Sequence, residues 1–343
     1  MSEPTGSITE RVGVDGTSTK WITYALAVVV SLAIFTVPMY NNDPYVHNLM
    51  AWILILAILT MGYNVLFGYT GMLSFGHAAF FGSGAYTVAF LMHYTQVTGL
   101  IPLLLAGTVV GTALAAVFGA VSLRTRDIYY ALLMLALAQI LYVLAVKLYN
   151  ITGGTDGLGI GLPTFLGAQV GGASIITYMA TFYYYVVALL FFASVVAVWI
   201  VLRSSFGHTL KTIRENEARA SAMGVPVTRY KLYSTLISGF FPGLAGALYA
   251  IQQGYIVPHI LDWTYSGQIV FMTLLGGANT FLGPIFGAAI FVLLRSYALD
   301  LVSFYWQFIM GFTMFMVVIT VGDDGFWGGF KTVLAYARGR FYE

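Results

Sequence analysis

The residues in this chain that could do chemistry are few, and most of them are uncharged. His77 follows Thr70 and Ser74 in a stretch crowded with glycine, G-Y-T-G-M-L-S-F-G-H, which begins at Gly68. Hydroxyl and imidazole groups among glycines, where the backbone can leave a helix, are suited to line a path for a polar solute. Close packing of small residues between helices explains the same pattern without any path. Both interpretations remain open for residues 68–76.

Further candidates for a solute path lie inside other apolar stretches. A second glycine-rich run, G-G-A-N-T-F-L-G-P-I-F-G, extends from Gly276 to Gly287, and discontinuous helices in two parts of a transporter point to its substrate path. Asn64 and Gln139 place amides among apolar residues, although hydrogen bonding between helices is the commoner use of such amides and of a buried histidine. The residues predicted to line the path are Gly71, Ser74, Gly76, His77, Asn64, Gln139, Gly276 and Gly277.

The chain lacks the groups that most enzymes need. It has no cysteine, and its five histidines are scattered without metal-ligand spacing. It also has no phosphate-binding G-x-x-x-x-G-K-[ST] stretch, so nucleotide hydrolysis by that route would need another protein. A net charge of +2 is too small to indicate a nucleic-acid partner. We therefore expect no catalytic site, no metal site and no cofactor.

The composition predicts that these residues are positioned by helices in a lipid bilayer. The chain of 343 residues is 59% hydrophobic and only 8% charged, with a mean hydropathy of +0.85, whereas a soluble domain carries about 25% charged residues. A helix needs roughly 20 apolar residues to cross a bilayer. Ten segments meet or approach this length: 21–40, 48–67, 73–93, 100–122, 128–148, 178–202, 232–253, 264–275, 281–297 and 303–321. We expect an all-α polytopic membrane protein with about ten spans; eight spans, with 264–275 and a neighbour as re-entrant pieces, are the alternative.

Basic residues predict the orientation of these spans. With the amino terminus in the cytoplasm, all of the 15 Lys and Arg residues except Lys147 and Arg295 fall in cytoplasmic segments. This pattern needs an even number of spans and places both termini in the cytoplasm. The predicted organisation is a cytoplasmic tail (1–20), a transmembrane domain (21–322) with a large cytoplasmic loop (203–231), and a second cytoplasmic tail (323–343). The expected location is the inner membrane of the cell, surrounded by lipid.

Acidic residues are absent from the middle of every predicted span. Proton-driven carriers keep an ionisable residue inside the membrane, although burying it there is energetically costly, because its protonation couples the proton gradient to transport. A proton relay is therefore not expected, although sodium coupling through backbone carbonyls stays open. The energy for uphill transport is expected to enter from outside the bilayer.

The loop 203–231 has the features of a docking site for a motor subunit. Residues 208–223 are predicted to form one helix, in which Glu215 precedes Arg219 by four positions, the favourable order for a charge pair. Gly224 and Pro226 end this helix, and an apolar stripe is formed by Leu210, Ile213, Ala220 and Met223. A loop that only fixes topology would not need such a helix. The predicted docking residues are Arg214, Glu215, Glu217, Arg219 and Gly224.

A third glycine cluster, T-G-G-T-D-G-L-G-I-G-L-P, lies at 152–163 in the longest outer loop, with Asp156 as its only charge. Asp156 is suited to contact a ligand or a docking protein. An acidic residue in a glycine-rich loop is more often a turn former.

Five stretches together resemble the branched-chain amino acid permeases of ABC transporters, over about 48–321: G-Y-T-G-M-L-S-F-G-H-A-A-F-F-G-S-G-A-Y-T, T-G-G-T-D-G-L, I-R-E-N-E-A-R-A-S-A-M-G-V-P-V-T-R-Y-K-L, F-P-G-L-A-G-A-L-Y-A and L-L-G-G-A-N-T-F-L-G-P-I-F-G-A. Of the two permease types, the chain is similar to the longer, M-type one. At 217–224 it reads E-A-R-A-S-A-M-G where ABC importers keep an E-A-A…G motif, so Arg219 replaces an alanine and the glycine comes one place late.

This resemblance implies a pore-forming subunit of an ATP-driven importer for branched-chain or other hydrophobic amino acids. It also implies a second, homologous permease subunit, two cytoplasmic ABC ATPase subunits and an extracytoplasmic substrate-binding protein as partners. Relatives that import urea or short amides provide a second possible function. A self-sufficient secondary transporter and an integral membrane enzyme are the remaining alternatives.

Overall fold

The computed structural model describes residues 43–125, 127–164, 178–301, 306–321 and 325. The predicted first span (21–40), the tail 1–20 and most of the tail 323–343 lie outside the described residues. In chain order the described elements are α3 (Pro44–Thr70), α4 (His77–Tyr94), α5 (Leu100–Ser122), α6 (Asp127–Lys147), α7 (Tyr149–Thr152), η1 (Gly154–Asp156), β1 (Leu158–Gly159), η2 (Tyr178–Tyr183), α9 (Tyr184–Arg203), α10 (Ser205–Glu215), α11 (Glu217–Ala222), α12 (Val227–Gln253), β2 (Tyr255–Ile256), η3 (Pro258–Leu261), α13 (Trp263–Gly276), α14 (Gly283–Leu301) and α15 (Trp306–Val321).

The described chain is predominantly helical, and helices occur in every predicted span from 48–67 onward. Among the described residues, five helices are long and apolar enough to cross a membrane, namely α3, α5, α6, α9 and α12. The helix α5 matches its predicted segment at both ends. The helix α4 starts at His77 rather than Leu73, because residues 71–76 leave the helical conformation. The count of ten spans and the side of the membrane on which each end lies stay predictions.

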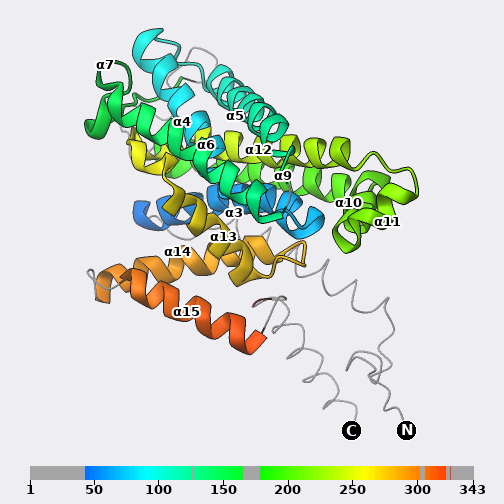
Figure 1. The fold of residues 1–343 in the computed structure, drawn as a ribbon. Helices are drawn as coiled ribbons and strands as arrows, with labels where there is room; N and C mark the ends of the chain where they lie inside the picture. Colours follow the sequence, from blue (N-terminus) through cyan, green and yellow to red (C-terminus); the bar gives the residue numbers. More distant parts are fainter. Residues whose placement is uncertain (1–42, 126, 165–177, 302–305, 322–324, 326–343) are drawn as a thin grey trace, which may run out of the picture.

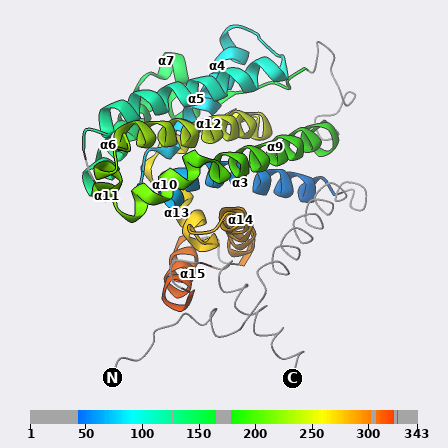
Figure 2. The same ribbon diagram turned by 90° about the vertical axis from the view of Figure 1, so that its right-hand side faces the viewer.

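The helix α12 lies at the centre of a bundle with α3, α4 and α5 (Figures 1 and 2). Glycines let these backbones touch. A Cβ atom on Gly246 would lie 1.9 Å from the carbonyl oxygen of Phe81, and one on Gly84 would lie 2.3 Å from that of Gly243. Gly84 and Gly246 thus serve close helix packing, as is common between membrane helices.

The helices α13 and α14 form a hairpin that packs on the other side of α3, with α15 outside it (Figure 1). The hydroxyl of Thr60, in the middle of α3, donates to the carbonyl of Pro284 at 3.0 Å. Pro284 lies in the first turn of α14, so this hydrogen bond joins the middle of α3 to the start of α14. The helix α3 is therefore enclosed on several sides, and 83% of its most apolar window is buried.

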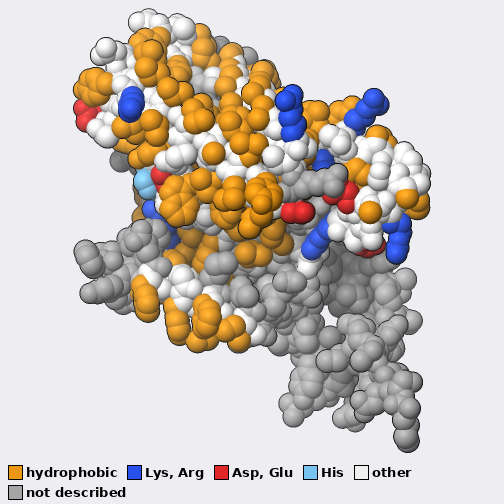
Figure 3. All heavy atoms as spheres, in the orientation of Figure 1, with side chains coloured by type: hydrophobic (Ala, Val, Ile, Leu, Met, Phe, Trp, Pro, Cys, Tyr) orange, Lys and Arg blue, Asp and Glu red, His pale blue; other side chains and the backbone are white. Residues whose placement is uncertain are grey.

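The two ends of the bundle differ in structure. The helices α10 and α11 lie at one end, and the two-stranded sheet of β1 and β2 lies at the other, at opposite ends of α12. Since α12 has 27 residues, the two ends are about 40 Å apart at 1.5 Å per residue. Figure 3 shows mainly apolar side chains over the bundle and several basic side chains near α10 and α11. A lipid-facing body with one basic end is typical of a multi-pass membrane protein.

Candidate solute path and docking helices

The predicted docking helix is in fact two helices. The helix α10 ends at Glu215, Asn216 adopts extended backbone angles (φ −160°, ψ 100°), and α11 begins at Glu217. Asn216 caps the second helix, because its side-chain oxygen accepts from the backbone N–H of Arg219 at 2.8 Å. Glu215 and Arg219 therefore do not lie on one continuous helix, and the predicted pairing between them is wrong.

The ion pair in this region of the described chain instead joins Glu217 to Lys231, at 2.6 Å. Of the predicted apolar stripe, Leu210, Ile213 and Ala220 are buried, whereas Met223 is 63% exposed because α11 ends one residue before it. Gly224 has a φ of +83°, which confirms its predicted role as the left-handed end of the helix.

Arg214 and Lys211 are exposed on α10, and both contact the end of α3. One guanidinium nitrogen of Arg214 donates to the backbone carbonyl of Gly68. The ammonium of Lys211 lies 5.3 Å from the centre of the Tyr69 ring, a cation–π distance. The carbonyl of Gly68 is near the carboxyl end of α3, where a cation is stabilised by the helix dipole. These contacts attach α10 to the end of α3.

The segment that joins α3 to α4, residues 71–76, begins next to the contact between Arg214 and the end of α3. Gly71 caps α3 with a φ of +78°, a conformation that glycine adopts without cost. A Cβ atom on Gly71 would lie 3.0 Å from Cγ of Arg214. Gly76 is at the other end of the segment, and its Cβ would lie 3.2 Å from Met134 of α6. The two glycines that were predicted to line a path therefore contact α10 and α6, respectively.

His77 lies at the centre of a buried polar cluster. Its Nδ1 is 3.1 Å from the hydroxyl of Ser74, and its Nε2 is 2.6 Å from the hydroxyl of Ser238 on α12. The Tyr63 ring packs against the His77 imidazole in a T-shaped arrangement, with 4.7 Å between the ring centroids. His77 is completely buried, and both of its ring nitrogens have neutral hydroxyl partners. In this conformation it holds α4 and α12 together and faces no open space.

A second cluster surrounds Asn64. Its side-chain N–H donates to the carbonyl of Thr280 at 3.1 Å, between α13 and α14. A Cβ atom on Gly68 would lie 2.2 Å from the carbonyl of Ala278 in the turn between α13 and α14, and one on Gly276 would lie 1.8 Å from the carbonyl of Gly283. Gly277 has a φ of +109°. These glycines therefore allow the turn between α13 and α14 to approach α3.

The structure thus brings the predicted path residues into two groups and leaves one apart. Ser74, Gly76 and His77 form the first group, with Gly71 at its edge, and Asn64, Gly276 and Gly277 form the second. Gln139 lies on α6, half-buried, and its buried side-chain oxygen has no hydrogen-bond partner among the described residues. Sequence reasoning missed Ser238 and also Ser234, whose hydroxyl lies 2.7 Å from that of Thr70. Two serines four residues apart on an apolar helix lie on one face.

The end of the bundle opposite α10 and α11 carries an ordered turn around Asp156. The hydroxyl of Tyr149 donates to the Asp156 carboxylate at 3.0 Å, and the hydroxyl of Tyr255 donates to the Asp156 carbonyl. The carboxylate raises the pKa of the Tyr149 phenol, because it accepts a hydrogen bond from the protonated hydroxyl and would repel the phenolate. Three glycines with φ between 54° and 74° make the turn compact: Gly153, Gly154 and Gly157. Asp156 is therefore both a turn residue and an oriented surface charge.

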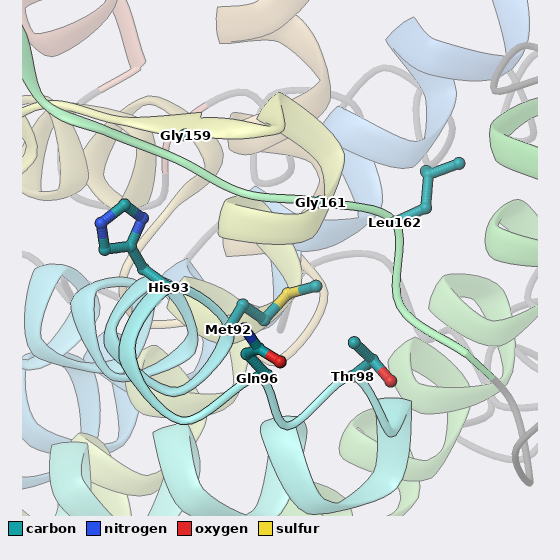
Figure 4. Close-up of a pocket in the computed structure, with 7 residues that line it drawn as sticks. All are labelled: Met92, His93, Gln96, Thr98, Gly159, Gly161 and Leu162. Atoms are coloured by element: carbon teal, nitrogen blue, oxygen red, sulfur yellow. The ribbon is translucent and has the colours of Figure 1, made fainter.

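A cavity of about 440 Å³ lies next to this turn, between the end of α4 and the segment that follows β1 (Figure 4). The side chain of Met92 lies beneath the backbone at Gly161, and His93 lies near Gly159. The residues that line it are Met92, His93, Gln96, Thr98, Gly159, Gly161 and Leu162. The cavity is open and contains no charged carboxylate or ammonium group.

Comparison with known proteins identifies the family. The family described as branched-chain amino acid transport system / permease component matches residues 45–318. The high-affinity branched-chain amino acid transport system permease proteins LivM of Salmonella typhimurium and of Escherichia coli are each 28% identical over 322 residues, covering 89% of this chain and 75% of the relative. LivH of Escherichia coli is 25% identical over 288 residues, covering 79% of this chain and 91% of the relative. No solved structure matches. The chain therefore belongs to the family of permease components of branched-chain amino acid transport systems.

Proposed function

We propose that this chain is the pore-forming subunit of an ATP-driven importer that moves branched-chain or other hydrophobic amino acids across the inner membrane. The observation that carries the proposal is the family match over residues 45–318. The relatives include both permease types of one transport system, LivM and LivH. We accordingly propose that the chain pairs with a second permease of the same family.

The helices α10 and α11 support the proposal that cytoplasmic ATPases dock on this chain. At the basic end of the bundle they share a small apolar cluster with the start of α12, formed by Ile213, Ala220 and Val227. Glu215, Glu217 and Arg219 are exposed on these two helices. We propose that these three side chains contact the ATPases, and that Gly224 sets where α11 ends.

The distribution of acidic residues supports an external energy source. Among the described helices long and apolar enough to cross a membrane, the one acidic residue is Asp127, the first residue of α6, and in the shorter α14 Asp300 is the second-to-last residue. A secondary carrier driven by protons would need such a group deeper inside a span. We propose that ATP hydrolysis by partner subunits supplies the energy.

We propose that the solute passes near the two polar clusters, because they flank the breaks before α4 and α14. Neutral hydroxyls and amides bind a solute only weakly. Affinity for the amino acid would then come from an extracytoplasmic binding protein. Urea or a short amide remains the alternative solute.

The test is uptake by the purified complex in lipid vesicles with ATP on the cytoplasmic side. We expect ATP-dependent uptake of labelled leucine, and none of labelled urea. Uptake of urea without uptake of leucine would show instead that the chain is a urea or short-amide permease. Uptake of leucine by the isolated chain on an ion gradient would contradict it.

A further inference from the structure

One arginine lies inside an apolar helix, at the end of the bundle opposite α10 and α11. Arg295 of α14 follows the apolar residues 291–294, and its Nε atom is buried. It comes six residues before Leu301, the last residue of α14, so it lies about 9 Å inside the helix at 1.5 Å per residue. An ionisable side chain within a membrane span is costly and generally marks a functional site.

The guanidinium of Arg295 is held against the neighbouring helix α3. Its Cζ atom lies 5.1 Å from the centre of the Trp52 ring, a cation–π distance. Trp52 is half-buried and comes eight residues after Pro44, the first residue of α3, which places it about 12 Å inside that helix. The positive charge therefore has a defined position between two helices, whereas an arginine that only anchors a helix extends its head group into water.

Two buried polar atoms near this contact have no hydrogen-bond partner among the described residues. The first is the indole N–H of Trp52, a donor. The second is the side-chain oxygen of Gln252, an acceptor near the end of α12. The amide nitrogen of Gln252 donates to the side chain of Asn48 at 2.6 Å, and Asn48 lies four residues before Trp52, on the same face of α3.

The beginning of α3 and the ends of α12 and α14 lie on the same side of the bundle, away from α10 and α11 (Figure 1). Buried polar groups are normally paired. An unpaired donor and an unpaired acceptor near a fixed cation therefore indicate a ligand that supplies both an acceptor and a donor. Because Trp52, Gln252 and Arg295 are only half-buried, such a ligand can reach them.

The three groups match the head group of a free α-amino acid. A guanidinium and an indole N–H are donors that suit a carboxylate, and the guanidinium also supplies the opposite charge. An amide oxygen suits an ammonium group, which has donors and no acceptor. Urea and short amides carry neither charge, so they would gain little from Arg295.

We propose that Arg295, Trp52 and Gln252 form a binding site, here called the head-group site, for the zwitterionic end of the amino acid. Arg295 and Trp52 donate to the carboxylate, and Gln252 accepts from the ammonium group. This inference rests on the proposed function, on which the end that bears α10 and α11 is cytoplasmic and the head-group site lies toward the outside. It lies about 18 Å along α3 from Asn64, and both are on the side of α3 that faces the α13–α14 hairpin.

Single variants test the three groups separately. Arg295→Gln removes the charge, and Arg295→Lys restores it without the forked geometry of the guanidinium. Trp52→Phe keeps an aromatic ring against Arg295 and removes the N–H donor. Gln252→Met removes the acceptor at similar side-chain length, and Gln253→Met is its control at the neighbouring, exposed position. Copurification of the partner subunits and thermal unfolding in detergent show whether each variant is folded.

The assay is saturation-transfer NMR on the purified complex without binding protein, because this method detects small molecules that bind weakly. The probes are leucine, leucinamide, which lacks the carboxylate, and 4-methylpentanoate, which lacks the ammonium group. The pH is about 6.5, where the α-amino groups are protonated. We expect the wild type to bind leucine about five- to tenfold more tightly than either analogue, as for one partly exposed charge-assisted contact.

Each variant should affect only the probes that carry the matching group. Arg295→Gln should weaken leucine and 4-methylpentanoate about five- to tenfold and leave leucinamide unchanged, and Arg295→Lys should recover part of this loss. Trp52→Phe should weaken the same two probes by about two- to fivefold. Gln252→Met should weaken leucine and leucinamide and leave 4-methylpentanoate unchanged, while Gln253→Met should resemble the wild type.

The outcomes separate the head-group site from the function on which it rests. A wild-type complex that accumulates no leucine with ATP overturns the proposed function and this inference with it. A complex that accumulates leucine but binds all three probes equally overturns the head-group site alone, as does equal leucine binding by the wild type and folded Arg295→Gln. If Arg295→Gln does not fold, the three probes on the wild type and on Trp52→Phe decide in the same way.

Discussion

The attachment of α10 to α3 through Arg214 makes a prediction that distinguishes force transmission from ATPase binding. The Arg214 guanidinium donates to the Gly68 carbonyl, so Arg214→Ala should leave the exposed ATPase contacts intact while disconnecting α10 from α3. A hydrogen bond from a charged group that is shielded from water contributes about 1.5–3 kcal/mol to stability. Arg214 is largely exposed, so about 1 kcal/mol is the appropriate figure. We expect about a fivefold loss of leucine uptake per ATP hydrolysed.

Gly71 allows the position of the Arg214 side chain over the end of α3 to be tested by a double-mutant cycle. Gly71→Ala places a side chain at φ +78°, which costs about 1–2 kcal/mol, and adds a Cβ atom 3.0 Å from Cγ of Arg214. In the variant that also carries Arg214→Ala, the crowding is gone and only the backbone strain remains. The double variant should therefore be less destabilised than the sum of the single variants, by about 0.5–1 kcal/mol.

The assay combines copurification of the ATPases, leucine uptake per ATP and thermal unfolding in detergent. Arg214→Lys is the matched control, because it keeps the charge but not the forked geometry of the guanidinium. Loss of the ATPases from purified Arg214→Ala would show that Arg214 binds them directly and would refute the reasoning. Unchanged uptake per ATP would refute it as well.

Three further predictions concern packing and charge. Gly246→Leu should abolish folded protein in detergent, since a Cβ atom there would lie 1.9 Å from the Phe81 carbonyl; Gly267→Leu, with no atom within 4 Å of its Cβ, should leave the yield unchanged. His77→Ala should destabilise the protein by about 3–5 kcal/mol, because it opens a cavity and leaves buried hydroxyls without partners, which thermal unfolding would detect. Glu217→Gln should change stability by less than about 1 kcal/mol in the same assay, since its ion pair is partly exposed.

Much of the fold could be predicted from local sequence. Long apolar segments determine where helices lie, and α5 coincides with its prediction at both ends. Gly224 was recognisable as a helix end because it is followed by Pro226. The break at Asn216 was missed, since the helical periodicity of the flanking residues continues across it. Asparagine is one of the residues preferred at the N-cap of a helix, so Asn216 was a signal in the sequence for a second helix start.

The candidate site could be predicted only in part, because its contacts join residues far apart in the chain. The partner of His77 is Ser238, 161 positions away, and the partner of Arg214 is Gly68, 146 positions away. Local patterns identified three of these four residues as important. They assigned Arg214 to an external partner, whereas its closest contact lies within the chain.

The most direct test of the central claim compares one purified chain with the assembled complex in vesicles of the same lipid composition. We predict that the complex with its ATPases and binding protein accumulates leucine when ATP is supplied, with or without an ion gradient. We also predict that the single chain accumulates none on a proton or sodium gradient. Leucine accumulated by the single chain on either gradient would contradict the account.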